Sequence, residues 1–122
     1  MKENADINYS YDFEFDIMDM KVPEKGKYKE SIQLDTGIYL DFDENNYPIN
    51  LEILEASKLL KIDKQYLTNP ELKVNIQINK NVIKVHVWIF YKIHDKKMSN
   101  DFNKEIINNF QVPDMEANLA IG

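Results

Sequence analysis

The segment DFDENNYPINLE holds the spacing of metal-ligating side chains that comes nearest to a known ion-binding loop. Asp41, Asp43 and Asn45 place oxygen atoms at positions 1, 3 and 5, and Glu52 follows at position 12, which is the pattern of an EF-hand calcium loop. Asn46, however, stands where the sharp turn of that loop needs glycine, and the flanks IYL and ILE are typical of strands. Two interpretations remain: a calcium site made by these four ligands, or a hairpin turn whose acids face solvent.

Other chemistry-bearing residues are scattered. Asp12, Glu14 and Asp16 alternate along one segment and have no basic or histidine partner nearby in sequence, so a solvated strand edge explains them. His86 and His94 lie eight positions apart, about 26 Å in an extended strand at roughly 3.3 Å per residue, which argues against a shared metal. The serines lack a nucleophile elbow, and the three glycines form no phosphate-cradling loop. We therefore predict no catalytic and no cofactor-binding residue, and expect a protein that is not an enzyme.

Composition indicates the number of domains and excludes or disfavours several kinds of site and partner. The chain has 122 residues, 43% of them hydrophobic, which predicts a single compact domain over 1–122. There is no cysteine, which excludes disulfides and zinc sites with thiolate ligands. All 15 basic residues are lysine, and arginine is the favoured residue for bidentate contacts to phosphate and guanine, so specific recognition of nucleic acid is disfavoured.

Charge is distributed unevenly. Residues 1–57 hold 14 Asp and Glu against 5 Lys, a net charge of −9, whereas residues 58–122 hold 7 against 10, a net charge of +3. This asymmetry favours either pairing of two copies of the chain or attraction of a basic partner to the front half. The start MKENADINYS lacks an apolar stretch, and no apolar run is long enough to span a bilayer. We therefore expect a cytoplasmic protein that does not contact membranes.

Residues 7–67 predict a β-meander followed by a short helix. Apolar residues alternate in a series of short segments separated by turn residues such as Gly26, Gly37 and Asn46. The predicted strands are Ile7–Tyr11, Asp16–Val22, Glu30–Asp35, Ile38–Asp43 and Ile49–Ile53. The period then changes, and Ala56, Leu59 and Leu60 fit helical spacing within a helix over Glu55–Leu67 that ends before Asn69-Pro70.

Residues 71–122 predict a long β-hairpin, a helix and a last strand. Alternation over Glu71–Ile78, and an apolar row from Ile83 to Ile93 on one face of Val82–Ile93, are typical of two strands joined by the Asn79–Asn81 turn. Phe102, Ile106 and Phe110 recur every four residues, which indicates a helix over Ser99–Phe110. The tail Met115–Ile121 is interpreted as a strand at a sheet edge. Together these elements predict an α+β fold with an antiparallel sheet.

The returning strand of this hairpin carries a second apolar face. His86, Trp88 and Phe90 lie opposite its main hydrophobic row, so this strand is expected to be covered on both sides. A helix or a second subunit must supply the cover. These three residues are the predicted interface, and we expect a homodimer.

The front half resembles a widespread family of small prokaryotic domains of unknown function. The resemblance lies in YDFEFD, which ends at Asp16, in GIYLDFD, which begins at Gly37, and in EILEASK, which begins at Glu52, so it covers about Ile7–Leu60. Thr36 and Asn50 depart from the family pattern, where aspartate and glycine are usual. The resemblance implies a small β-meander with a helix and no established catalytic residues. It also implies an antitoxin-like or partner-binding role for members encoded in two-gene cassettes.

Two functions follow from the sequence. The first is a non-enzymatic protein-interaction module, antitoxin-like or regulatory, that binds a protein partner or itself. The alternative is a metal-binding or small-molecule-binding protein that uses the acidic turn, with calcium as the candidate ion.

Overall fold

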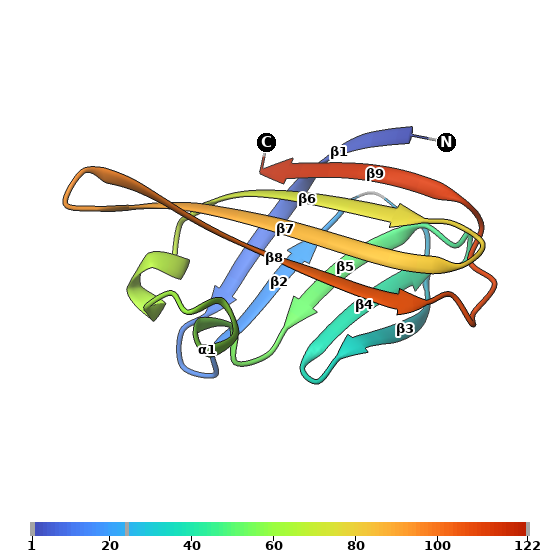
Figure 1. The fold of residues 1–122 in the computed structure, drawn as a ribbon, viewed down its shortest axis with the longest axis horizontal. Helices are drawn as coiled ribbons and strands as arrows, with labels where there is room; N and C mark the ends of the chain where they lie inside the picture. The colour runs from blue at the N-terminus through green and yellow to red at the C-terminus, as the bar shows by residue number, and fades with distance from the viewer. Residues whose placement is uncertain (1, 24, 122) are drawn as a thin grey trace.

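The computed structural model describes residues 2–23 and 25–121, which form one nine-stranded sheet in the order β3-β4-β5-β2-β1-β9-β6-β7-β8 (Figure 1). The strands are β1 (Lys2–Asp12), β2 (Ile17–Lys21), β3 (Tyr28–Asp35), β4 (Ile38–Asp43), β5 (Pro48–Ile53), β6 (Glu71–Ile78), β7 (Val82–Ile93), β8 (Lys96–Ile107) and β9 (Met115–Ile121). Between β5 and β6 lie the helix α1 (Ala56–Leu60) and the 3₁₀ turn η1 (Lys64–Leu67). Neither helical segment of the described residues has the length or hydropathy to cross a bilayer.

The first strand joins two halves of the sheet. Residues 2–7 of β1 pair in parallel with β9, whereas residues 8–12 pair antiparallel with β2. A strand shared in this way turns a corner, and the half made of β9, β6, β7 and β8 crosses over the half made of β2, β5, β4 and β3 (Figure 1). Near the two outer edges, the Lys104 Nζ atom of β8 lies 2.6 Å from the Asp35 Oδ2 atom at the end of β3. The apolar core fills the space between the two halves.

Strict alternation places the core residues. In β6, and in β7 as far as Ile89, every second side chain is buried, and the buried set is Leu72, Val74, Ile76, Ile78, Ile83, Val85, Val87 and Ile89. In the other half, Ile38, Leu40 and Phe42 of β4 and Leu51 and Ile53 of β5 are buried. The prediction of a long hairpin from residue 71 to residue 93 is confirmed, since β6 and β7 pair in unbroken antiparallel register.

The predicted helix over Ser99–Phe110 is wrong, because most of this segment belongs to the strand β8. Phe102 and Ile106 are four residues apart, and this spacing places two side chains on one face of a strand as well as of a helix. Asn100 lies on the same inward face, where its side-chain Nδ2 donates to the Leu60 carbonyl at 2.8 Å. Lys104, also on this face, reaches Asp35. These tertiary partners satisfy the polar side chains that interrupt the strand pattern.

The α+β prediction is therefore wrong, and the fold is almost entirely sheet. The expected helix over Glu55–Leu67 is only the five residues of α1 followed by the four of η1. The tail Met115–Ile121 is a strand as predicted, but it lies between β1 and β6 in the middle of the sheet rather than at an edge. The true edge strands are β3 and β8.

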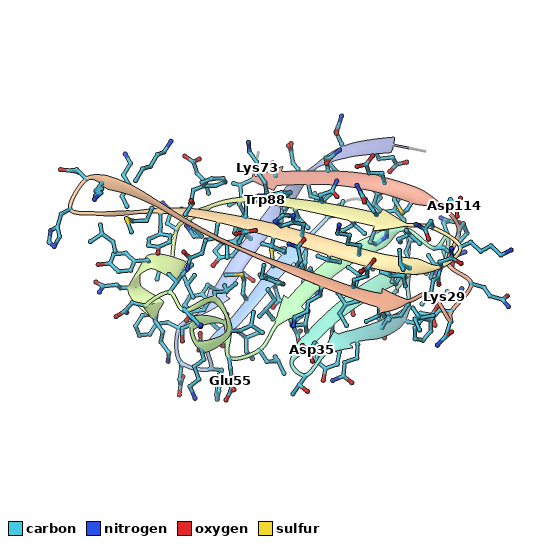
Figure 2. The ribbon with its side chains drawn as sticks, in the orientation of Figure 1. Lys29, Asp35, Glu55, Lys73, Trp88 and Asp114 are labelled. Atoms are coloured by element: carbon cyan, nitrogen blue, oxygen red, sulfur yellow. The ribbon has the colours of Figure 1, made fainter. Side chains whose placement is uncertain are left out.

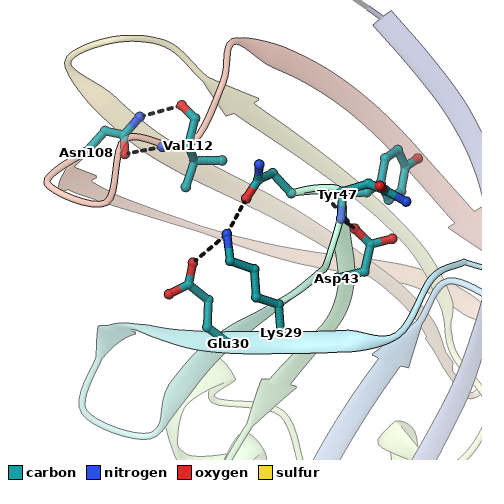
Figure 3. Close-up of polar contacts among 8 residues, drawn as sticks. Lys29, Glu30, Asp43, Tyr47, Asn108 and Val112 are labelled. Carbon is teal, nitrogen blue, oxygen red and sulfur yellow. Dashed lines mark hydrogen bonds and ion pairs between the residues drawn. The ribbon is translucent and has the colours of Figure 1, made fainter.

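Side-chain amides close the loop between β8 and β9. The Asn108 Nδ2 atom donates to the Asn79 carbonyl at 2.8 Å. It also donates to the Val112 carbonyl at 2.9 Å, and the Asn108 Oδ1 atom accepts from the Val112 amide (Figure 3). Asn108 is buried, so these bonds replace the ones it would make to water. The turn after β6 and the loop before β9 are thereby held together.

Candidate functional site

The outer face of β6, β7 and β8 presents an aromatic row to solvent. Trp88 and Phe90 point away from the core on β7 and are half-buried among their neighbours. Backbone register places Lys73 of β6 on one side of Trp88 and Asp101 of β8 on the other. In Figure 2 Lys73 is labelled directly above Trp88 over this part of the sheet. An aromatic residue is therefore flanked by one positive and one negative charge.

His86 stiffens this arrangement. Its ring stacks on Trp88, with 3.7 Å between centroids and 21° between planes. Its Nε2 atom lies 2.7 Å from the Asp101 Oδ2 atom. Because the imidazole is fixed on both sides, the indole beneath it is also held in one orientation, and an ordered aromatic surface loses little entropy on binding.

A hollow of about 720 Å³ opens beside Trp88, over the strands β1, β9 and β6. Its lining includes Asn4, Asp6, Lys73, Asn118 and Ala120 in addition to the aromatics of β7. The small side chain of Ala120, opposite Lys73 in the register of β9 and β6, forms part of its lining. The hollow combines a flat aromatic wall with amide, carboxylate and ammonium groups, which is the usual make-up of a binding surface.

A ladder of amides extends from the rim of the hollow. The Asn75 Nδ2 atom donates to Asn118 Oδ1 at 2.8 Å and to Glu116 Oε2 at 3.0 Å. Gln77 donates to the same Glu116 oxygen at 3.2 Å. These bonds fix the polar side chains of four neighbouring residues, so the face is ordered beyond the aromatic row.

In the acidic turn, the predicted ligand Asp43 binds backbone amides of the protein and is not part of an assembled ion site. Asp43 is 1% exposed, and its Oδ1 accepts the amides of Asn45 and Tyr47, both at 2.9 Å (Figure 3). Its Oδ2 accepts the Gly26 amide at 3.1 Å. Asn45 itself is exposed at the tip of the turn. Both oxygens of the central predicted ligand are thus occupied by backbone donors.

The other two predicted ligands lie on the outer face of the sheet. Asp41 accepts from the Ser31 hydroxyl at 2.5 Å and from the Asn50 Nδ2 atom at 3.2 Å. Glu52 is opposite Asp19 in the register of β5 and β2. Burial raises the pKa of Glu52, and the negative charges of Asp19 and Asp41 raise it further. In residues 2–23 and 25–121 no group of three or more His, Asp or Glu side chains is arranged to hold a metal ion.

The sequence motif at the front of the chain forms a polar cluster around a buried aspartate, which we call the Asp16 cluster: Tyr11, Asp16 and Ser57. Asp16 is 6% exposed, and its Oδ1 accepts the Tyr11 hydroxyl at 2.6 Å and the Ser57 amide at 2.9 Å. Its Oδ2 accepts the Ser57 hydroxyl at 2.6 Å. The two ends of the motif therefore meet in space and join the β1–β2 turn to the start of α1.

Sequence reasoning found the aromatic row but missed the charges beside it. His86, Trp88 and Phe90 share one face of β7, as predicted from their spacing. Lys73 and Asp101 were missed because they are distant in sequence and Asp101 was assigned to a helix. Assigning residues 96–107 to a strand would have placed Asp101 beside Trp88.

Comparison with known proteins places the chain in a family. Residues 8–57 match the family described as "protein of unknown function (DUF2283)". An uncharacterized protein of Methanocaldococcus jannaschii, MJ0789, is 34% identical over 86 residues, which cover 69% of this chain and 72% of that protein. The chain belongs to the DUF2283 family. The resemblance to a family of unknown function, predicted from the YDFEFD and EILEASK motifs, is confirmed.

A second relative of this DUF2283 protein carries a functional name. A protein of Methanosarcina mazei named a putative hypoxanthine phosphoribosyltransferase is 28% identical over 113 residues, which cover 92% of this chain and 90% of that protein. No solved structure matches the chain.

Proposed function

We propose that this DUF2283 protein is a non-enzymatic protein-interaction module that binds its partner through the outer face of β6, β7 and β8. The observation that carries the proposal is the ordered row of His86, Trp88 and Phe90 on the solvent side of a strand whose other side is already buried in the core. Tryptophan and other aromatics dominate binding energy at interfaces because they bury large areas at small entropic cost. This proposal includes an antitoxin-like or a regulatory role, since a protein in either role acts by binding another protein.

Affinity capture from the native cell tests the proposal. Wild type, Trp88→Ala and Tyr39→Ala are immobilised in parallel, and bound proteins are quantified by mass spectrometry. Tyr39 is the matched control because it lies on β4, in the other half of the sheet. We expect one partner to be retained by wild type and Tyr39→Ala and reduced at least ~10-fold by Trp88→Ala, the scale of one aromatic anchor.

Binding of that partner after purification completes the test. Trp88 is the only tryptophan in the chain, so its fluorescence reports on this face alone. A saturable change in Trp88 emission when the purified partner is titrated in supports the proposal. Equal retention of every captured protein by wild type and Trp88→Ala, with no change in emission, would refute it.

A second candidate is binding of a planar small molecule in the hollow beside Trp88. Its volume, about 720 Å³, lies in the range of ligand pockets, and the indole offers a stacking surface next to the Asn118 amide. The name of the M. mazei relative suggests hypoxanthine as the first probe. Quenching of Trp88 emission by hypoxanthine, abolished in Asn118→Leu, supports this candidate, and an unchanged emission spectrum up to millimolar hypoxanthine counts against it.

A further inference from the structure

We infer that the partner on this face is a second copy of the chain, related by a two-fold axis that runs parallel to β7. The inference rests on the proposed function, because it uses the same outer face, and it adds the identity of the partner and the geometry of the contact. In this arrangement Trp88 lies at the axis and meets its own counterpart. Each copy contributes the same surface, as two-fold interfaces require.

The axis direction follows from the charges that flank Trp88. A two-fold axis along β7 exchanges left and right, so β6 of one copy faces β8 of the other. Lys73, on one side of Trp88, then lies opposite Asp101 of the second copy. None of the ion pairs among the described residues includes Lys73, whose Nζ atom lies 5.9 Å from the Phe90 ring centroid. The second copy supplies the carboxylate that this lysine lacks.

The same exchange gives compatible pairs between β6 of one copy and β8 of the other. The register places four residues of β6 and four of β8 at matching heights on either side of β7. The pairs brought together across the axis are Glu71 with Ser99, Lys73 with Asp101, Asn75 with Asn103, and Gln77 with Glu105. Each pair joins a hydrogen-bond donor to an acceptor, and one joins opposite charges.

The alternative axis is disfavoured by the same residues. A two-fold axis that crosses the strands at Trp88 would place Lys73 against Lys73 and Asp101 against Asp101, and like charges in contact cost binding energy. The axis along β7 has two unfavourable contacts: Lys92 meets its counterpart beyond the aromatic row, and Lys84 meets its counterpart at the other end. Glu105 lies beside Lys84 in both copies and offsets the repulsion between the two Lys84 side chains.

The contact is small. Three strands about 4.8 Å apart and four outward positions about 6.7 Å apart cover a face well below the roughly 800 Å² per partner of a stable interface. We therefore expect a weak dimer that forms as concentration rises. Sheet faces that stack about 10 Å apart allow the side chains of Lys73 and Asp101 to meet between them.

Charge exchange tests the geometry directly. Wild type is measured by sedimentation equilibrium and native mass spectrometry from about 1 µM to about 1 mM, the range that brackets a weak Kd. We expect the mass to rise from 14.5 kDa toward twice that value. Lys73→Glu and Asp101→Lys should each lower the dimer fraction at least ~10-fold, because each places like charges at both symmetric contacts.

Mixing the two variants gives the decisive result. Lys73→Glu and Asp101→Lys, each monomeric alone, should form a heterodimer, because both contacts of the mixed pair then join opposite charges. Lys80→Glu, in the exposed turn after β6, is the matched control and should dimerise as wild type does. Thermal unfolding of each variant shows that monomers are folded.

The outcomes separate the inference from the proposed function. A wild type that stays monomeric throughout overturns the inference alone, since Trp88-dependent capture of another protein would still support the interaction module. If Lys73→Glu, Asp101→Lys and Trp88→Ala all leave the dimer fraction unchanged, the proposed geometry is wrong and the chain self-associates through another surface. Failure of the mixed variants to pair, when both are folded and wild type dimerises, also overturns it.

Discussion

Replacing Asp16 by asparagine removes one charge from the Asp16 cluster without changing the shape of the side chain. Asp16 has a φ of 59°, a left-handed conformation that asparagine also tolerates, so the substitution adds little backbone strain. The remaining oxygen can still accept from Tyr11 and the Ser57 amide, whereas the new NH₂ group takes the place of the oxygen that accepts the Ser57 hydroxyl.

The magnitude follows from the three hydrogen bonds. Bonds to a charged acceptor contribute about 1.5–3 kcal/mol each, and bonds to a neutral one about 0.5–1.5 kcal/mol. Losing one charged bond and weakening two others should lower the free energy of unfolding by about 3 kcal/mol. For a chain of 122 residues this corresponds to a fall in Tm of roughly 10 °C.

The effect should depend on pH. Burial alone would raise the pKa of Asp16, but the hydrogen bonds from Ser57 and Tyr11 and the charge of Lys64 outweigh it and hold the pKa below its ordinary value of 3.8. A carboxyl whose pKa is lowered by folding stabilises the protein above the unfolded pKa, and that stability is lost as pH falls through the folded pKa. The gap between wild type and Asp16→Asn should therefore be constant near neutrality and narrow below about pH 4.

Urea unfolding followed by circular dichroism, repeated between neutral and acidic pH, measures this gap. Ser57→Ala and Tyr11→Phe remove one donor each, and their double mutants with Asp16→Asn should be less than additive because the residues share bonds. A loss below about 1 kcal/mol at pH 7, or a gap that does not narrow in acid, would show that the cluster does not stabilise the fold in this way.

Three further predictions concern the turns and the outer face. Asp43→Ala leaves three backbone amides without their acceptor and should lower the free energy of unfolding by about 3 kcal/mol in urea titrations, whereas exposed Asn45→Ala should change it by less than about 0.5 kcal/mol. Glu52→Gln should raise Tm at pH 7 by roughly 1–3 °C, because folding raises the pKa of Glu52 and so opposes ionisation of this carboxyl. The gain in Tm should vanish when the pH falls below 4.5, the ordinary pKa of this group, because the carboxyl is then protonated in both the folded and the unfolded protein. His94 and Asp95 both have positive φ, as a type I′ turn requires, so His94→Asn with Asp95→Gly should stabilise the hairpin by about 0.5–1 kcal/mol in the same titrations.

Each of these has a result that would contradict it. Equal unfolding midpoints for Asp43→Ala and Asn45→Ala would mean that the turn amides find water instead of the carboxylate. A Glu52→Gln protein that is less stable than wild type at neutral pH would show that the carboxylate is favourably placed. Loss of stability in the turn variant would indicate that His94 or Asp95 makes a contact that outweighs the backbone preference.

Much of the sheet was predictable because alternation is a local property. Ile38, Leu40 and Phe42 reveal their strand without any knowledge of the neighbours, and the same is true of β6 and β7. The strand β8 was not predictable in this way, because Asn100 and Lys104 interrupt its inward face. Their partners, Leu60 and Asp35, come from distant segments, so the residues look misplaced until the fold is known.

The candidate site was also predictable only where the pattern is local to one strand. The aromatic row on β7 was found because its members share one strand. The acidic turn was misleading because ligand spacing says nothing of where each carboxylate points. Asp43 faces inward onto backbone amides while Asp41 faces outward, and only the pleat of the folded strand and the bulge in its pairing with β5 decide this.

The position of β9 has a consequence for synthesis on the ribosome. It is the last of these nine strands to emerge, yet it lies between β1 and β6 and pairs with both. Until residues 115–121 are available, β1 and β6 each expose an unpaired edge, and open edges are templates for aggregation. Contacts between the first and last strands also have the greatest sequence separation, which slows folding. The nascent chain therefore exposes two unpaired edges until β9 emerges, and a holding chaperone would protect it more than faster formation of any hairpin.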